Sequence, residues 1–288
     1  MTRAKTLQFH SATFELVGKK PKRSRRALEL LKKRERQCGV RFPAAVREWY
    51  LVSGPALGLD IGCGKTTDEM VPLRELGEPL ANWYAMGSAD FVRAGLLIVI
   101  HENQGVCTWV VKLDGSDDPP VVVEVDSSYK AASLSKIRWQ RCAESFSTFM
   151  YCRAWDHGHS LDPISVWSAA QDQPLARRDL AFLRANFTEG PRTFGHPGVA
   201  NYRFFTADSA MLIWAKKGGA DWHLMASSDE ALLRLLRCVS HAGTLTETLY
   251  TFDDPRSEAV LERARAEWTR SRKQLPAGRK RAPRKNRR

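Results

Sequence analysis

Apolar residues recur at helical spacing near the start of the chain and predict two consecutive helices. In residues 22–38, KRSRRALELLKKRERQC, the apolar side chains fall on one broad side, and Gly39 suits the end of a helix. In AAVREWYLVSG, Val46, Trp49 and Tyr50 follow an i, i+3, i+4 spacing. We therefore expect two helices joined by a short link, and the charges of the first are expected to form its solvated face.

The pattern then changes to short apolar runs, which predict β-structure. LLIVIHE, CTWVVKL and VVVEVD are separated by the turn sequences NQG and DGSDDPP, an order typical of an antiparallel meander. The following stretch, SFSTFMYCRAW, places Phe146, Phe149 and Met150 on one face of a helix that Ser145 or Ser147 could cap. Helices gathered on an antiparallel sheet indicate the α+β class.

The second half of the chain repeats this mixture on a smaller scale. LARRDLAFLRANF predicts an amphipathic helix and EGPRTFGHPG a loop. YRFFTADSAMLIWAKKGGADWHLMASS predicts three strands, the last two joined by a Gly-Gly turn. SDEALLRLLRCV predicts a helix capped by Ser228, and SEAVLERARAEW a final helix.

These elements divide the chain into five expected segments. The stretch DHGHSLDPISVWSAAQDQP is rich in turn formers and is interpreted as a linker between two α+β domains. The segments are a lead-in at 1–21, a first domain at 22–156, a linker at 157–173, a smaller accessory α+β module at 174–269, and a disordered basic tail at 270–288.

The net charge of +13 is distributed unevenly along the 288 residues. Residues 1–50 carry 14 Lys and Arg against 4 acids, and residues 270–288 carry 10 against none. The part between them, 51–269, has 21 basic and 28 acidic residues and is therefore mildly acidic. The tail either solubilises the chain or binds nucleic acid non-specifically through phosphate contacts.

The glycine-rich run GLDIGCGKTTDEM resembles a phosphate-binding loop at first sight. That loop requires a glycine four residues before its Gly-Lys pair, and here Leu59 stands at this position. The run also follows a helix, whereas a phosphate-binding loop follows a buried strand. We therefore expect no nucleotide at 58–67, but a mobile surface loop in which Lys65 is exposed.

Catalytic and metal-binding patterns are not recognisable. The six cysteines include no CxxC pair, which favours reduced, structural thiols and a cytoplasmic location. His101-Glu102 lacks the second histidine of a zinc-protease helix, and His157 and His159 lie in the expected linker. No apolar run approaches the about 18 residues of a membrane span. We expect a non-enzymatic protein without cofactor or metal, with a hydrolase of unrecognised site as an alternative.

The order of these elements resembles the SUKH superfamily, which includes Smi/Knr-type cell-wall regulators and bacterial immunity proteins. The similarity covers about residues 22–155 and includes the ENQG turn, the DPPV strand entry and the phenylalanine-rich SFSTFM helix. Phe42 and Ser53 stand where leucine and asparagine are more usual in that family. The N-terminal positions that match its pattern are Gly39, Phe42-Pro43, Trp49-Tyr50 and Ser53-Gly54.

The resemblance implies a protein-binding module, and an immunity protein that neutralises a nuclease-type toxin is one such function. Carboxylates would then stand where the substrate phosphates of the toxin dock. The alternative is a nucleic-acid-associated protein that binds through its cationic termini, including residues 270–288. The candidate partner-binding residues lie in two turns and are Glu102, Asn103, Asp114, Asp117 and Asp118.

Overall fold

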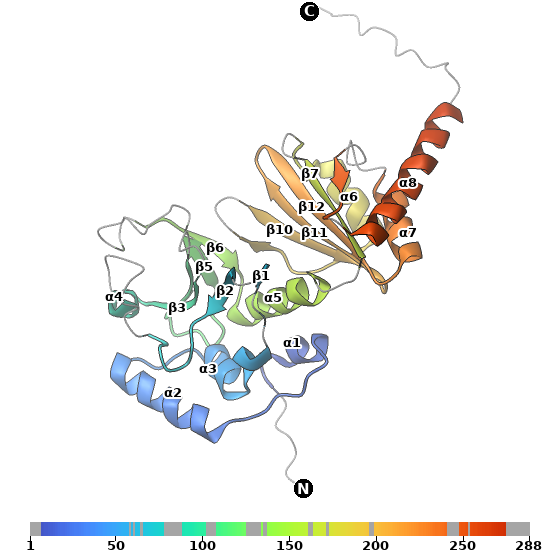
Figure 1. Ribbon diagram of the computed structural model, residues 1–288. Coiled ribbons are helices and arrows are strands. Elements are labelled where there is room, and N and C mark those ends of the chain that lie inside the picture. Colours follow the sequence, from blue (N-terminus) through green and yellow to red (C-terminus); the bar gives the residue numbers. More distant parts are fainter. Residues whose placement is uncertain are drawn as a thin grey trace, which may run out of the picture.

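The computed structural model has two α+β units that lie side by side, each built around one antiparallel sheet (Figure 1). This is the fold class that the sequence predicts. The structure describes residues 7–57, 59, 61–63, 66–77, 88–101, 108–124, 134, 137–160, 164–170, 173–195, 199–240, 248–252 and 254–274.

The first sheet has six strands that follow one another in sequence order. The predicted meander forms its centre, with Trp109 paired to both Ile100 and Val123. A further strand after the meander was not predicted. The strands are β1 (Ile61–Cys63), β2 (Thr66–Met70), β3 (Leu96–His101), β4 (Thr108–Lys112), β5 (Val121–Glu124) and β6 (Trp139–Ala143).

Two helices of this unit have side-chain caps at their N-termini. Ser24 accepts a hydrogen bond from the Ala27 amide at 3.1 Å, and Gly39 ends the same helix in the left-handed conformation. Ser145 caps the closing helix through the Thr148 amide, also at 3.1 Å, as predicted. The helices are α1 (Ser11–Leu16), α2 (Arg25–Cys38), α3 (Ala44–Leu51), α4 (Ser88–Arg93) and α5 (Phe146–Ser160), with a 3₁₀ turn at Gly54–Leu57.

The centre of the first core is the indole of Trp49, which is fully buried. Gly54 lies against it, and a Cβ atom there would stand 2.2 Å from the indole ring. The adjacent Tyr50 donates a hydrogen bond of 2.5 Å to the carbonyl of Val71. The second predicted helix is thus fixed on both sides, by ring packing and by a buried hydroxyl that has a partner.

The segment expected to be a lead-in, 1–21, contributes to this core. The Glu48 carboxylate accepts hydrogen bonds from the amides of Gln8, Phe9 and His10 at 2.8 to 3.0 Å. His10 also packs edge-on against Trp49, with the ring centroids 4.9 Å apart. One carboxylate thus satisfies three consecutive backbone amides and fixes the segment that leads into α1.

The glycine-rich run does not form the loop that we expected. Its described residues build the hairpin of β1 and β2, in which Ile61 pairs with Asp68 and Cys63 with Thr66. β2 then joins the central strand β3 through Glu69 and Met70. The interpretation as a surface loop was therefore wrong, because an alternation of glycine and apolar residues also suits a short strand at a sheet edge. Lys65 lies outside the described residues.

The second sheet has the order β13-β7-β12-β11-β10-β8, with β9 pairing to β10. The three strands predicted from the sequence are its neighbours β10, β11 and β12, and the hairpin of the last two turns at Lys217-Gly218. The strands are β7 (Ile164–Ala170), β8 (Thr188–Glu189), β9 (Thr193–Phe194), β10 (Ala200–Phe205), β11 (Ser209–Lys216), β12 (Gly219–Ala226) and β13 (Leu249–Tyr250).

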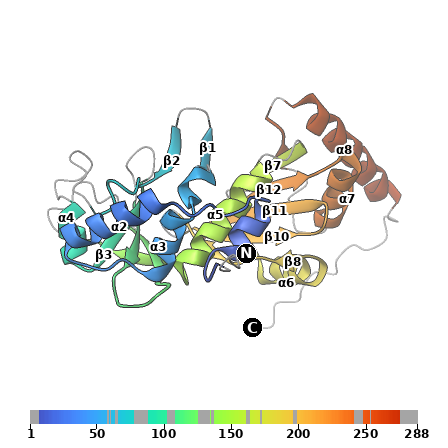
Figure 2. The same ribbon diagram turned by 90° about the horizontal axis from the view of Figure 1, so that it is seen from below.

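Three helices cover one face of this sheet (Figure 2). Ser228 caps α7 through the Ala231 amide at 3.3 Å, as predicted. Leucines on the inner side of α7 pack on the alternate residues of β11 and β12 that point to that face. The helices are α6 (Arg177–Asn186), α7 (Asp229–Val239) and α8 (Pro255–Gln274).

Two expected boundaries differ from the structure. The stretch 157–173, expected to be a linker, contains the end of α5 and the whole of β7, a strand between β13 and β12. The basic tail was expected to start at 270, but α8 continues to Gln274. The turn-forming residues on both sides of β7 led to the linker interpretation. The apolar pattern of the strand itself is only seven residues long, too short to outweigh them.

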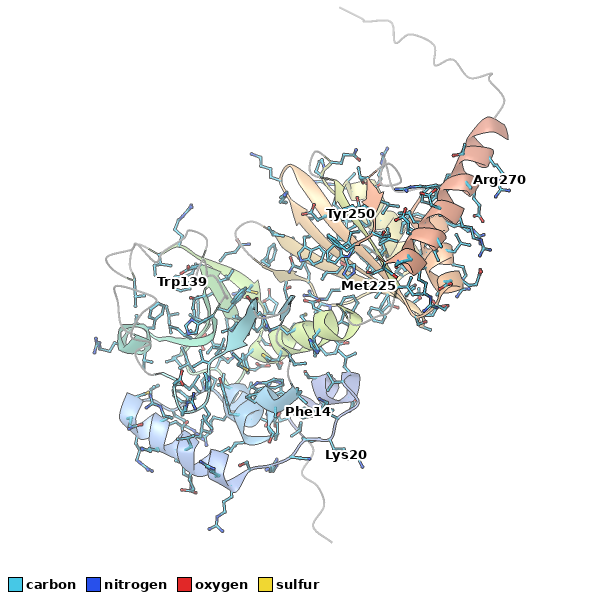
Figure 3. The ribbon with its side chains drawn as sticks, viewed as in Figure 1. Phe14, Lys20, Trp139, Met225, Tyr250 and Arg270 are labelled. Atoms are coloured by element: carbon cyan, nitrogen blue, oxygen red, sulfur yellow. The ribbon has the colours of Figure 1, made fainter. Side chains whose placement is uncertain are left out.

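The two units meet along α5, whose last turns pack on the second face of the second sheet. Trp155 is buried there against Ala210, Leu212 and Met225, and Figure 3 shows Met225 near α5. Two strands of different sheets, β6 and β9, also make contact. α5 is thus a shared element, and its two ends belong to different cores.

A buried ion pair between α5 and the second sheet stabilises the contact of the two units. The guanidinium of Arg203 donates two hydrogen bonds to the carboxylate of Asp156, at 2.6 and 2.5 Å, and two more to Pro191 O and Thr193 Oγ1. The side chain of Arg203 is 2% exposed and that of Asp156 13%. Burial opposes the charge of Arg203, but the adjacent carboxylate outweighs it and raises the pKa of the guanidinium.

Replacing this arginine tests whether the contact stabilises the chain. We expect Arg203→Met to lower the free energy of unfolding by about 3–5 kcal/mol, because Asp156 would keep a buried charge without its partner. Urea denaturation followed by tryptophan fluorescence measures the change. Arg263→Met is the matched control, since its pair with Glu230 is exposed and is worth at most about 1 kcal/mol. Equal effects of the two substitutions would contradict the prediction.

Candidate functional site

The structure describes three of the five predicted partner-binding residues. Asp114 and Asp117 are exposed in the turn between β4 and β5, and Asp118 is half-buried. Glu102 and Asn103 lie outside the described residues. Whether these side chains bind a partner stays a prediction.

The turn of the three aspartates has a structural role. Asp118 accepts hydrogen bonds from the amide and the hydroxyl of Ser147 at 3.0 and 2.5 Å, so its carboxylate caps the first turn of α5. The carbonyl of Asp117 accepts the Ala45 amide at 2.8 Å, near the start of α3. Asp114 accepts the Ser116 amide within the turn itself. Of the three carboxylates, those of Asp114 and Asp117 are the more available to a partner.

A second candidate site, which the sequence did not indicate, lies on the second sheet. Alternate residues of its strands point away from α6, α7 and α8, and α5 covers one end of that face. Beyond α5, the strand register places Tyr250, Trp167 and His223 side by side on β13, β7 and β12. We call these three residues, together with Trp214 and Phe252, the aromatic patch.

The rings of the aromatic patch are arranged as a flat stack with a tilted rim. The ring centroids of Trp167 and His223 are 3.7 Å apart, and those of Trp167 and Trp214 are 5.6 Å apart with planes only 6° from parallel. Phe252 stands edge-on to Trp167 at 5.5 Å and to Tyr250 at 5.2 Å. Offset stacked and edge-to-face rings are the two favoured aromatic geometries.

The rim of the aromatic patch is open to solvent. Phe252 is 65% exposed and Tyr250 is 37% exposed, and both count among the few large apolar side chains with such exposure in the described chain. Figure 3 shows Tyr250 on the sheet, on the side away from α5. Single exposed apolar residues are common, but a contiguous group of aromatic rings is a feature of interaction surfaces.

Two polar atoms beside these rings have no hydrogen-bond partner in the described part of the chain. They are Nε2 of His223 and Oδ1 of Asp221, which is on the same strand and pairs with Trp214. The other carboxylate oxygen of Asp221 lies 4.0 Å from Nζ of Lys216. Buried polar atoms are costly when unsatisfied, so these two mark hydrogen-bonding capacity that the described chain leaves unused beside the rings.

Burial determines the protonation of His223. It lowers the pKa of the imidazole to about 4, so the ring is neutral at physiological pH. A neutral ring stacks on Trp167 without carrying a charge into the sheet. The arrangement can therefore bind a flat or cationic group by stacking, and Asp221 adds the negative charge.

The thiols of the described residues are not arranged for chemistry. Cys38, Cys142, Cys152 and Cys238 form no disulfide, and burial raises the pKa of Cys142 and of Cys152 to about 12. Thiols in this state are protonated and react slowly. No group of three or more metal-ligating side chains occurs within the described ranges. The helices described there include none with the length and apolarity to cross a bilayer.

Sequence reasoning missed the aromatic patch because its members come from separate segments. Trp214 and His223 lie in strands that were predicted, but Trp167 lies in the expected linker and Tyr250 in a two-residue strand. The alternation in IWAKKGGADWH does place Trp214 and His223 on one face. That signal identifies two of the five residues of the patch and does not reveal their neighbours across the sheet.

Comparison with known proteins gives no match: no protein-family model, no curated protein and no solved structure corresponds to this chain.

The buried imidazole predicts how stability depends on pH. As pH falls below about 6.5, the unfolded chain binds a proton at this histidine, but the folded chain does so only near pH 4. Stability is therefore lost between these values. In His223→Phe this loss should be smaller by roughly 3 kcal/mol, as measured by urea denaturation at pH 7 and pH 4. His101, whose pKa burial also lowers to about 4, is present in both proteins and cancels. Parallel pH curves for the two proteins would refute the assignment.

Proposed function

We propose that this chain is a non-enzymatic protein-binding module that holds a basic protein partner on the aromatic patch. The observation that carries the proposal is the open rim of Tyr250 and Phe252 beside the stacked tryptophans. Tryptophan and tyrosine dominate the energetics of protein interfaces, because they bury a large area with little loss of conformational entropy.

The chemistry around the rings favours a partner that presents arginine. A guanidinium stacks on the face of a tryptophan and gains electrostatic attraction from the ring. Asp221, paired with Trp214 across the two strands, offers a carboxylate oxygen without a partner in the described chain. A stacked guanidinium that also reaches this oxygen would satisfy both groups, and Arg is enriched at interface hot spots for this reason.

The charge of the chain supports a basic partner as well. Residues 51–269, which contain the aromatic patch, hold 28 acidic and 21 basic residues. An acidic body attracts a cationic protein over distances of about a Debye length and speeds its association. Nucleases are basic where they bind their substrate, so a nuclease-type toxin is a partner of this chemistry.

The resemblance of residues 22–155 to the SUKH superfamily supports the same proposal from the sequence. It rests on Gly39, Phe42-Pro43 and Ser53-Gly54, together with the order of the strands that follow. In this proposal the protein is an immunity protein, the first unit is of Smi/Knr type, and the second unit supplies the contact surface.

Substitutions in the rim test the contact. We expect Phe252→Ala and Trp167→Ala each to weaken binding to a toxin encoded by a neighbouring gene by about 30-fold or more, the effect of losing an interface hot spot. Calorimetric titration measures the affinity. Leu16→Ala is the matched control, because Leu16 is an exposed apolar residue, 40% accessible, on the other unit.

Co-expression with the toxin tests whether the chain acts as an immunity protein. Cells that carry the toxin and the unaltered chain should survive, and those with Phe252→Ala should lose this protection. Phe252 is so exposed that its replacement leaves the core intact, which thermal melting of the variant verifies. If the neighbouring toxin neither binds nor is neutralised, the immunity function is refuted. If it binds equally well to the rim variants, the partner docks elsewhere.

A further inference from the structure

The N-terminal cations gather on one surface of the first unit. Between residues 19 and 41, ten Lys and Arg side chains are exposed, and Glu29 is the one exposed acid in the same range. The helix α2 carries half of these cations. In both views this helix lies on the outside of the first unit, far from the second sheet (Figures 1 and 2).

Helical geometry places the α2 cations on a single stripe. At 3.6 residues per turn, Arg25, Arg26, Lys32, Lys33 and Arg36 fall within about a third of the helix circumference. The stripe extends about 16 Å along the axis, at 1.5 Å per residue. Duplex DNA carries one phosphate charge per about 1.7 Å of its axis, so the stripe spans several phosphates.

Most of these cations form no ion pair with an acid within the described residues, unlike several arginines of the second unit. On the second unit, four arginines each lie within 2.5 to 2.7 Å of a carboxylate oxygen: Arg237, Arg256, Arg263 and Arg265. In the stripe, Lys32 lies 3.4 Å from Glu29, and its other four cations form no ion pair within the described residues. Four of the five charges of the stripe are thus not neutralised by an acid of the described chain.

We propose that this stripe, with the basic residues that precede it, binds the phosphate backbone of a nucleic-acid duplex. Lys20, Lys22 and Arg23 extend the surface at the start of α2, where the helix dipole adds positive potential. Binding releases counterions from the duplex and therefore weakens steeply with salt. The proposal is independent of the aromatic patch, which lies on the other unit.

The residues around the stripe favour a nucleic-acid duplex over a membrane surface or a single strand. A membrane-bound amphipathic helix needs a free apolar face, but the apolar side of α2 is packed inward, with Leu31 fully buried. Base stacking needs aromatic rings, and residues 19–41 contain none. The stripe therefore contacts phosphates along a duplex and does not discriminate between sequences.

Neutralising the stripe tests the proposal in the full-length protein. The variant carries Arg25→Gln, Arg26→Gln, Lys32→Gln, Lys33→Gln and Arg36→Gln, which keep helix propensity because glutamine is a good helix former. Fluorescence anisotropy with a labelled random-sequence duplex DNA measures affinity over a range of salt concentrations. We expect binding to weaken at least about tenfold, and the slope of log affinity against log salt to fall by up to about 4.5.

Two matched variants distinguish the contribution of the stripe to DNA binding from the effect of removing positive charge elsewhere in the chain. Replacing the four paired arginines of the second unit with glutamine should change affinity by less than about twofold, since their charge is already neutralised. Deleting residues 275–288, which carry 7 cations, should leave the effect of the stripe intact.

A stripe variant that binds like the unaltered protein overturns the proposal, as does complete loss of binding on deletion of the tail. Equal binding to phosphatidylserine vesicles would show a membrane surface as the ligand and would overturn it too.

Discussion

The ion pair of Arg203 and Asp156 is the contact on which the arrangement of the two units depends. It joins the last turns of α5 to β10, and its four hydrogen bonds leave the guanidinium little freedom. A buried charge tolerates few alternative positions, because any other position leaves it unsatisfied. α5 therefore covers one end of the outer face of the second sheet, and the other end, with the aromatic patch, stays open.

Charge in this chain has two roles, and pairing distinguishes them. On α7 and α8 the arginines lie next to carboxylates, so their charges are largely neutralised at the surface. On α2 the cations face solvent in a row. The same contrast holds for carboxylates: Glu48 and Asp118 bind backbone amides at helix starts, whereas one oxygen of Asp221 has no hydrogen-bond partner in the described chain. The net charge of the chain does not distinguish these side chains. Their partners do: a charged group that is paired within the fold stabilises the structure, and one that is not paired can bind another molecule.

Both proposed surfaces follow from what the fold leaves unpartnered. The aromatic patch is the part of a sheet face that none of the described helices covers, and the stripe is a row of cations of which only Lys32 has an acidic neighbour within the described residues. Aromatic rings with a free carboxylate suit a basic protein, and a row of cations suits phosphates. The two surfaces lie on different units, so each can be removed by substitution without altering the other.

The sequence by itself determined the elements whose signals are local. The Gly39 stop, the caps Ser145 and Ser228 and the periodicity of the apolar residues located three helices, and turn residues separated the strands of both meanders. Tertiary structure decided the rest. β7 was hidden in an expected linker, the glycine run became a hairpin, and the aromatic patch brings together Trp167 and Tyr250 from strands paired across the sheet. A two-residue alternation fixes the face on which a side chain lies but not the neighbour across the sheet, because strand order depends on long-range pairing that leaves no local trace.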